Sequence, residues 1–236
     1  MQTQTVSHPR GAEFIHALVA SCERKRYFAK AAIIAQGDVC QDLYFVIKGT
    51  ASLRLRTPSN HDLVLALIHG GEFFGETGLF EADARCPAAV RAKTACEVAR
   101  ISHTRLRASP ALFTGLMPLL APQLARQLDV LQRKTAEMAF YDLETRLTTA
   151  LRYLASGPDA YFHPEGKAIA VTRTELAAMT GASREMVGRL LKRMHKRGIV
   201  RAKGSSMTVL DYVKPRVIEV PRPSEYVSTT VASMRL

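Results

Sequence analysis

Residues Thr172–Gly198 read TRTELAAMTGASREMVGRLLKRMHKRG. This stretch predicts two helices joined by a tight turn. The first helix covers Thr174 to Thr180, and Gly181 follows it as a residue that adopts positive φ at little cost. Ser183 is an N-cap residue type, so its hydroxyl is expected to accept a free backbone N–H of the second helix. The apolar residues of that second helix recur at the i, i+3 and i+4 spacing of a core-facing stripe: Met186, Val187, Leu190, Leu191 and Met194.

The opposite face of the second helix is basic. It carries Arg184, Arg189, Lys192, Arg193, Lys196 and Arg197. In a helix-turn-helix, the N-terminal residues of the second helix meet base edges in the major groove. Arginine pairs bidentately with guanine, and glutamate accepts from the cytosine amino group. Arg184, Glu185 and Arg189 are therefore candidates for reading bases; a basic helix on an ordinary globular surface is the alternative.

The run TRTELAAMTGASREMVGRLLKRM also closely resembles, without gaps, the DNA-binding helix-turn-helix of the catabolite activator (CRP/FNR) family of bacterial transcription regulators. The resemblance implies that Arg184, Glu185 and Arg189 read TGTGA-like half-sites of palindromic double-stranded DNA. The full set of expected DNA-contacting residues is Thr172, Arg173, Ser183, Arg184, Glu185, Gly188, Arg189, Lys192 and Lys203.

The composition of the chain is consistent with double-stranded DNA as its partner. The chain has 236 residues, enough for two domains with separate cores, and it is 47% hydrophobic and 23% charged, as ordinary soluble proteins are. Its 33 Lys and Arg residues against 21 Asp and Glu give a formal charge of +12, which favours a polyanionic partner. Charge alone would equally suit an RNA or a membrane surface. No signal peptide and no run of about 18 apolar residues is visible, so we expect a cytoplasmic protein without a membrane span.

The cysteines and the catalytic residue types form no recognisable motif. The four cysteines, Cys22, Cys40, Cys86 and Cys96, include no CxxC pair, so we expect reduced thiols and no metal site. No G-x-S-x-G motif occurs, and the His, Asp and Glu residues lack a catalytic spacing. The sequence therefore predicts no catalytic residues and a protein that is not an enzyme.

Between Ile33 and Ile101 the pattern changes to short alternating segments separated by glycine-bearing turns. Such segments predict a β-roll or jelly roll. The expected strands are Leu43–Ile47, Ala51–Arg56, Leu63–Ile68, Val90–Lys93 and Cys96–Ile101. Before them, residues 1–12 are expected to be loose and Glu13–Cys22 to form a short helix.

The block from Gly75 to Ala99 looks like the cyclic-nucleotide-binding cassette of the same family. A short helix starting near Glu76 would offer free N–H groups to a phosphate, Glu76 would accept from a ribose hydroxyl, and Arg85 would neutralise the phosphate. The nucleotide-contacting positions implied by the resemblance are Gly75, Glu76, Thr77, Arg85, Cys86, Leu131 and Gln132.

Several of these positions depart from the family pattern. The family cassette reads Arg-Ser/Thr-Ala where this chain has Arg85-Cys86-Pro87-Ala88, so the hydroxyl donor is lost in either alignment register. Leu131 cannot hydrogen-bond to an adenine, and Gln132 can do so only in altered geometry. Each lost charge-assisted hydrogen bond costs about 1.5–3 kcal/mol, so we expect weak binding of cyclic AMP in the usual pose. Three alternatives stay open: cyclic di-GMP held by Arg and Lys residues between the domains, a degenerate pocket kept as a scaffold, and ligand-independent DNA binding.

A heptad seam marks the predicted long helix Leu119–Met138, which follows a short helical connector at Pro110–Gly115. In the family that this chain resembles, the corresponding helix pairs with its copy in a second subunit, which implies a homodimer; packing onto the β-roll alone is the alternative. The seam residues, at 4-3-4-3 spacing, are Leu124, Leu128, Leu131, Thr135 and Met138.

The C-terminal part continues the resemblance. Asp142 is the expected N-cap of a helix over Leu143–Ala155. The turn Asp159–Lys167 resembles the RNA-polymerase contact loop of the family, although a plain connector has the same composition. Strands at Ile199–Ala202 and Met207–Leu210 predict the wing of a winged helix. The residues implied for the polymerase contact are His163, Pro164, Glu165 and Gly166.

Together these features predict an α+β chain with three functional parts. They are a cyclic-nucleotide-binding-like β-roll (jelly roll) sensor over 1–115, a dimerisation helix and hinge over 116–140, and a winged helix-turn-helix over 141–214, before an unassigned extension over 215–236. The implied function is a homodimeric, sequence-specific DNA-binding transcription regulator that needs no cofactor and is ligand-independent or controlled by cyclic di-GMP or cyclic AMP. The alternative is a ligand-sensing regulator that acts mainly through protein–protein contacts, with DNA binding secondary.

Overall fold

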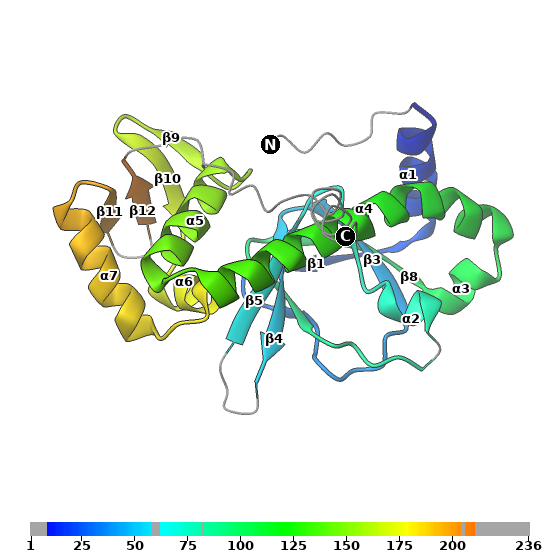
Figure 1. Cartoon of the computed structure of the whole chain (residues 1–236). Coiled ribbons are helices and arrows are strands. Elements are labelled where there is room, and N and C mark those ends of the chain that lie inside the picture. The colour runs from blue at the N-terminus through cyan, green and yellow to red at the C-terminus, as the bar shows by residue number, and fades with distance from the viewer. Residues whose placement is uncertain (1–8, 58–61, 82, 204–205, 211–236) are drawn as a thin grey trace, which may run out of the picture.

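A computed structural model describes residues 9–57, 62–81, 83–203 and 206–210 of the chain (Figure 1). Its N-terminal part contains two four-stranded sheets, with strand orders β1-β8-β3-β6 and β2-β7-β4-β5, and all neighbouring strands are antiparallel. An apolar cluster from both sheets fills the space between them, which confirms the predicted β-roll. The strands are β1 (Glu23–Tyr27), β2 (Ala32–Ile34), β3 (Asp42–Lys48), β4 (Thr50–Arg56), β5 (Asp62–His69), β6 (Phe73–Phe74), β7 (Ala89–Ala92) and β8 (Cys96–Ser102).

Strand β3 shows how the sequence builds this arrangement. Successive side chains of a strand point to opposite faces. Tyr44 and Val46 join the cluster between the sheets, whereas Leu43 and Phe45 join a second cluster under α1 (Pro9–Ser21), α3 (His103–Arg107) and α4 (Pro110–Phe140). Because both faces of β3 are buried, its sequence is a nearly continuous apolar run.

Helix α4 is longer than the sequence predicted. It begins at Pro110 rather than Leu119 and includes the segment expected as a separate connector, with Pro118 and Pro122 inside it. Proline removes a backbone donor and usually ends a helix. Tertiary packing outweighs that preference here, because Leu116 and Leu120 are fully buried on the β-roll. The Gln123 side chain adds two hydrogen bonds to the Phe73 backbone, accepting from its N–H at 2.8 Å and donating to its carbonyl at 2.7 Å.

The C-terminal part combines three helices with a third antiparallel sheet of order β11-β12-β10-β9. Asp142 caps the first helix as predicted, since its carboxylate accepts from the Thr145 N–H at 2.8 Å. The predicted wing is the hairpin β11–β12. The expected exposed turn at Asp159–Lys167 is instead a second hairpin, β9–β10. The elements are α5 (Leu143–Ser156), β9 (Tyr161–His163), β10 (Gly166–Ala170), α6 (Arg173–Thr180), α7 (Arg184–Lys196), β11 (Val200–Lys203) and β12 (Ser206–Val209).

The N-terminal helix also differs from its prediction. Helix α1 begins at Pro9, not Glu13, so residues 9–12 are helical rather than loose. Residues 1–8 and the extension 215–236 lie outside the described residues. In the part of the chain that the structure describes, every helix is too short or too polar to cross a membrane.

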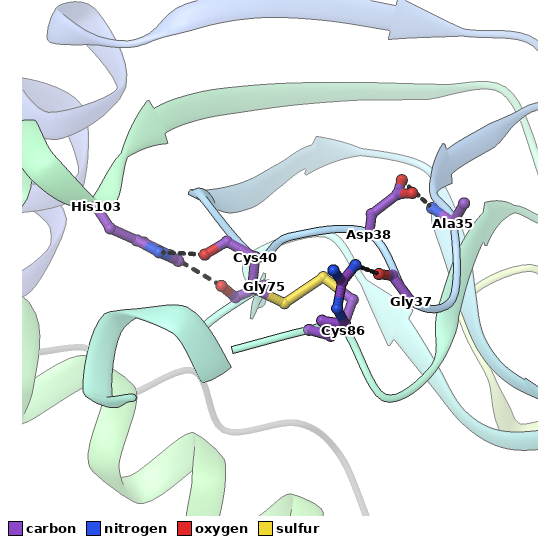
Figure 2. The surroundings of a disulfide bond; sticks show 8 residues. Ala35, Gly37, Asp38, Cys40, Gly75, Cys86 and His103 are labelled. Carbon is purple, nitrogen blue, oxygen red and sulfur yellow. Dashed lines mark hydrogen bonds between the residues drawn. A yellow bond between two sulfur atoms is a disulfide. The ribbon is translucent and has the colours of Figure 1, made fainter. Parts of the chain in front are cut away.

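Two of the four cysteines form a disulfide, which contradicts the prediction of four reduced thiols. Cys40 is bonded to Cys86, while Cys22 and Cys96 are free (Figure 2). Backbone hydrogen bonds hold the two segments together: the Cys40 N–H donates to the Ala84 carbonyl and the Gly37 N–H to the Cys86 carbonyl, each at 2.8 Å. The resulting Cα separation of 5.3 Å suits a disulfide. The pair is 46 positions apart in the chain, so no local motif announces it.

We expect Cys86→Ser to lower the free energy of unfolding by about 2–4 kcal/mol, because the disulfide restricts the unfolded chain. Urea denaturation followed by circular dichroism measures this change. The half-buried free thiol Cys22 gives the control, and Cys22→Ser is expected to unfold like the wild type. Dithiothreitol should weaken the wild type to a similar degree and leave the Cys86→Ser variant unaffected. A wild-type transition that dithiothreitol does not move would contradict a stabilising disulfide.

Candidate nucleic-acid interface and phosphate sites

Helices α6 and α7 form the predicted helix-turn-helix. A capping box begins α6: the Thr172 hydroxyl accepts from the Glu175 N–H at 3.1 Å, and the Glu175 carboxylate accepts from the Thr172 N–H at 2.8 Å. Gly181 ends that helix in the left-handed region, with φ of +63°. The Ser183 hydroxyl then accepts from the Met186 N–H at 3.2 Å and caps α7. Local sequence therefore fixes both ends of α6 and the start of α7.

The core-facing stripe of α7 is narrower than predicted. Four of its expected residues are buried, namely Val187, Leu190, Leu191 and Met194. Met186 is 45% exposed, so its predicted place in the core is wrong. It precedes the first buried residue by one position, which is about 100° around the helix, and therefore lies at the edge of the stripe. Its side chain adds apolar surface beside the exposed Arg184 and Glu185.

The two ends of α7 differ in how their charges are paired. Arg193 and Arg197 both pair with Glu144 of α5, the first at 3.8 Å. Among the described residues, no carboxylate pairs with Arg184 or Arg189, and both side chains are exposed. The N-terminal end of α7 thus presents free guanidinium groups, as a DNA-reading helix requires.

The remaining predicted DNA contacts are distributed around this end. Arg173, Ser183, Glu185 and Lys192 are exposed, while Thr172 and Gly188 are half-buried. The backbone of Lys203 pairs with Ser206 in the wing, and its side chain lies outside the described part of the chain.

The helix-turn-helix packs directly against the β-roll of the same chain. Val64 of β5 is 4% exposed and belongs to the hydrophobic core of the C-terminal part, and Leu67 packs against that core. Figure 1 shows α4 crossing the molecule from the β-roll to α6, beside β5. Near the end of α4, the Lys134 ammonium donates to the Met179 carbonyl. Burial lowers the pKa of Lys134.

A polar contact also joins the two parts. Asp159, in the loop after α5, accepts from the Thr50 hydroxyl at 3.1 Å, and its other carboxylate oxygen lies 3.3 Å from the Lys93 ammonium. The Thr50 hydroxyl also lies 3.2 Å from Nδ1 of His69, and burial lowers the pKa of that imidazole. These contacts and the apolar ones together fix where the helix-turn-helix lies on the β-roll.

This docking leaves a basic groove of about 570 Å³ between the two parts. The β-roll supplies one wall and the start of the helix-turn-helix supplies the other. Six lining residues are basic and one is acidic. The sequence analysis expected Arg and Lys residues between the domains to hold cyclic di-GMP, but it did not identify them. Which of these residues come together depends on how the two domains dock. The lining residues are Lys30, Arg54, Arg91, Ala92, Lys93, Thr172, Arg173, Thr174, Glu175 and Arg184.

The cassette inside the β-roll departs from the family pattern at Arg85-Cys86-Pro87, and it also contains the disulfide. Glu76 precedes the short helix α2 (Thr77–Phe80), and burial raises the pKa of its carboxyl. Arg85 is exposed and donates to the Gly37 carbonyl at 2.9 Å. Cys86 is 5% exposed and has no thiol to offer a phosphate, because its sulfur is bonded to Cys40.

The His103 ring braces this region. It lies 3.1 Å from the Cys40 carbonyl and 3.0 Å from the Gly75 carbonyl (Figure 2). Gly78 of α2 packs so closely on Cys40 that a Cβ there would lie 1.9 Å from the Cys40 carbonyl oxygen. The disulfide, the histidine and α2 therefore form one packed unit.

The other two predicted nucleotide positions lie on α4. Leu131 is half-buried and Gln132 is exposed. Within the described residues, no hydrogen bond connects either of them to Glu76, Thr77 or Arg85. Within the described part of this single chain, the two groups of predicted nucleotide positions are therefore not joined by a hydrogen bond.

The heptad seam of α4 is exposed in its middle and covered at its ends. Leu128 is 58% exposed, whereas Leu124 packs on the β-roll cluster. Leu131 is half-buried, and the Thr135 hydroxyl bonds to its own helix. Met138 is engaged by the C-terminal part, with its sulfur 2.9 Å from an Arg146 nitrogen.

The predicted polymerase-contact residues His163, Pro164, Glu165 and Gly166 occupy the tip of the β9–β10 hairpin. Glu165 pairs with Arg201 of the wing at 2.5 Å, and its N–H donates to the His163 ring at 3.2 Å. The described residues contain no group of three His, Cys, Asp or Glu side chains placed to hold a metal ion.

Comparisons with known proteins match both parts of the chain. Residues 24–109 match the cyclic nucleotide-binding domain family, and residues 145–214 match the Crp-like helix-turn-helix domain family. The chain is 38% identical over 207 residues to the cAMP-activated global transcriptional regulator Vfr of Pseudomonas aeruginosa, a match that covers 86% of this chain and 97% of Vfr. It is 36% identical over 191 residues to the cAMP-activated global transcriptional regulator CRP of Salmonella typhimurium, covering 81% of this chain and 91% of CRP.

A solved structure extends the similarity to a regulator with a different ligand. The c-di-GMP responsive global regulator CLP of Xanthomonas campestris superposes with a TM-score of 0.78 at 34% identity, covering 85% of this chain and 99% of CLP. The relatives of this chain therefore include regulators named for each of the two nucleotides.

Gly181 offers a test of the helix-turn-helix geometry. We expect Gly181→Ala to destabilise the protein by about 1–2 kcal/mol, because an L-residue is strained at positive φ. The new Cβ would also lie 3.2 Å from the Met138 sulfur. Gly157→Ala is the matched control, since that glycine has φ of −78° and an added Cβ would meet nothing closer than 3.4 Å. Thermal denaturation compares the two variants, and equal transitions would contradict the left-handed turn.

Proposed function

Because the chain belongs to the CRP/FNR family of transcription regulators, we propose that it acts as a homodimer that reads palindromic double-stranded DNA with TGTGA-like half-sites. The observation that carries this proposal is that Arg184 and Arg189 at the start of α7 are exposed and pair with no carboxylate of the described residues. The contrast with Arg193 and Arg197, which Glu144 engages, supports a division of α7 into a reading end and an anchoring end.

Each predicted DNA contact has a proposed role. Arg184 and Arg189 pair with guanine edges, and Glu185 accepts from a cytosine amino group. Thr172, Arg173, Ser183, Gly188, Lys192 and Lys203 contact the phosphate backbone, which positions the reading residues. We propose the domain limits 1–115, 116–140, 141–214 and 215–236. Helix α4 begins at Pro110 and therefore crosses the first of these limits.

We propose that the second subunit covers the exposed middle of the α4 seam, around Leu128. The tip of the β9–β10 hairpin, His163–Gly166, is the proposed RNA-polymerase contact. We place the protein in the cytoplasm, where a regulator of bacterial transcription meets its DNA, and we assign it no catalytic role.

The proposed effector is a nucleotide second messenger. Cyclic AMP activates Vfr and CRP, and cyclic di-GMP is the ligand named for CLP. The cassette of this chain argues against tight binding of cyclic AMP in the usual pose, because Cys86 is bonded to Cys40 and Arg85 is turned to the Gly37 carbonyl. We therefore favour cyclic di-GMP over cyclic AMP.

We expect Arg184→Ala to weaken binding to a cognate operator by about 1–3 kcal/mol and to relax base preference at one position. Fluorescence anisotropy on operators with single base changes measures both effects. Lys196→Ala is the control, since it removes the same charge about 18 Å further along α7 and is expected to change affinity little. Equal weakening on all sequences would instead make Arg184 a phosphate contact.

We expect Leu128→Glu to shift the protein from dimer to monomer and to lower operator affinity, because a carboxylate would be buried in the apolar seam. Analytical ultracentrifugation gives the mass. Arg126→Glu is the control: Arg126 is exposed on α4 and lies off the seam, so this variant should remain a dimer. A dimeric Leu128→Glu protein would rule out the seam as the interface.

A further inference from the structure

We propose that the Cys40–Cys86 disulfide is a reversible thiol–disulfide exchange site, and that its reduction opens the cassette to the phosphate of a cyclic mononucleotide. The proposal rests on the proposed function, since it concerns which nucleotide the sensor domain accepts. Small-molecule thiols keep most cysteines of cytoplasmic proteins reduced, and the disulfides that form there are usually catalytic or redox-sensing. This disulfide lies within the nucleotide-binding domain, which points to sensing.

The disulfide lies directly beneath the surface of the β-roll. Cys40 is 8% exposed and Cys86 is 5% exposed. The residues before and after each cysteine are exposed to solvent, namely Val39, Gln41, Arg85 and Pro87. A small thiol therefore needs only a local opening of these two segments to reach the sulfur atoms, and the sheets can stay folded.

The two segments also meet through backbone hydrogen bonds at the edge of the β-roll. The Cys86 N–H donates to the Asp38 carbonyl at 2.8 Å, next to the bond from the Cys40 N–H to the Ala84 carbonyl. The bridge between residues 39 and 85 lies outside the named strands. Hydrogen bonds between solvent-exposed segments open readily, so the covalent bond controls how often this edge separates.

The position of Arg85 depends on the closed edge. Its guanidinium donates to the Gly37 carbonyl at 2.9 Å, and the Gly37 N–H donates to the Cys86 carbonyl. When the two segments separate, Arg85 loses this neutral partner. A phosphate is a better acceptor for a guanidinium, because a hydrogen bond between ions is about twice as strong as a neutral one. Reduction also returns an S–H donor, although a weak one, to Cys86.

The two features that argue against cyclic AMP in the oxidised cassette are thus both reversible. One is the bond from Cys86 to Cys40, and the other is the contact of Arg85 with Gly37. Reduction removes the first and weakens the second. The redox state of one cysteine pair therefore sets the affinity of the cassette for a cyclic mononucleotide.

The disulfide is connected to the rest of the molecule through two helices. The Cys40 carbonyl lies 3.1 Å from Nδ1 of His103 in α3, and Gly78 of α2 packs on the same carbonyl. Leu79 of α2 and Leu106 of α3 are buried in the cluster that also holds α4 on the β-roll. A displacement of Cys40 therefore acts on helices that pack against α4, the helix with the proposed dimer seam.

The exchange uses glutathione-type thiols and is balanced. A small thiolate attacks one sulfur of the Cys40–Cys86 bond and forms a mixed disulfide, while the other cysteine leaves as a thiolate and takes up a proton. A second small thiol then attacks the mixed disulfide and releases the remaining cysteine. Two small thiols are oxidised to one small disulfide, and the protein disulfide is reduced to two thiols. An excess of the small disulfide drives the same steps in reverse.

The test compares the purified full chain after treatment with glutathione disulfide and after treatment with dithiothreitol, using cyclic AMP as the probe. Alkylation followed by mass spectrometry should count two thiols in the oxidised chain, Cys22 and Cys96, and all four cysteines in the reduced chain. Calorimetry should show that the reduced chain binds cyclic AMP about tenfold to a hundredfold more tightly, the gain expected for one charge-assisted hydrogen bond.

Three variants assign this gain to the proposed residues. Cys40→Ala removes the disulfide and keeps Cys86, so it should bind cyclic AMP like the reduced wild type in both conditions. Arg85→Ala should lose most of the gain when reduced. Cys22→Ser keeps the disulfide and should respond to dithiothreitol as the wild type does. The wild-type comparison needs no substitution, so it stands even if a variant folds poorly.

Several results would overturn the proposal. They are equal affinities of the oxidised and reduced wild type for cyclic AMP, a Cys40→Ala protein that still responds to dithiothreitol, and an Arg85→Ala protein that keeps the full gain. A disulfide that no mixture of reduced and oxidised glutathione converts would be purely structural, which also overturns it. Operator binding is measured in both redox states, and a chain that binds no operator in either state contradicts the proposed function instead.

Discussion

Val64 is a strand residue of the β-roll that is buried in the hydrophobic core of the helix-turn-helix. Apolar burial of this kind is the largest favourable term that holds two domains together. Here it determines which side of α6 and α7 faces the sensor, and therefore which cations meet across the groove. The hydrogen bonds of Asp159 to Thr50 and Lys93 add direction to that contact, because they require a particular rotation of one domain on the other. The proposed DNA-reading residues are thus positioned by packing against residues outside the helix-turn-helix.

The disulfide gives Cys86 of the cassette a structural role. Cys86 lies at the position that the family resemblance assigns to phosphate recognition, yet its sulfur is directed inward to Cys40 and its side chain is part of the apolar cluster between the sheets. The backbone carbonyls around it are engaged as well, by His103 and by neighbouring N–H groups. The polar groups of this region form hydrogen bonds within the chain.

The sequence predicted the elements whose causes are local. The caps Asp142 and Ser183 and the turn at Gly181 each act within a few residues, and all three have the expected geometry. What the sequence could not predict depends on contacts between distant segments. The continuity of α4 through Pro118 and Pro122 comes from packing on the β-roll, and the disulfide and the groove join segments that are far apart in the chain. The exposure of Met186 depends on the exact rotation of α7 on its core, which periodicity does not resolve.

Met138 illustrates how one side chain can connect two processes. It ends the proposed dimer seam, and it also lies against Gly181 and Arg146 of the helix-turn-helix of its own chain. A partner helix that claimed this position would have to displace those contacts. In the proposed dimer, subunit association and domain docking are then coupled equilibria, in which the amount of protein present influences how the proposed reading helices are held. Under this arrangement the cell's own expression level of the regulator is an input to its activity, alongside any small molecule.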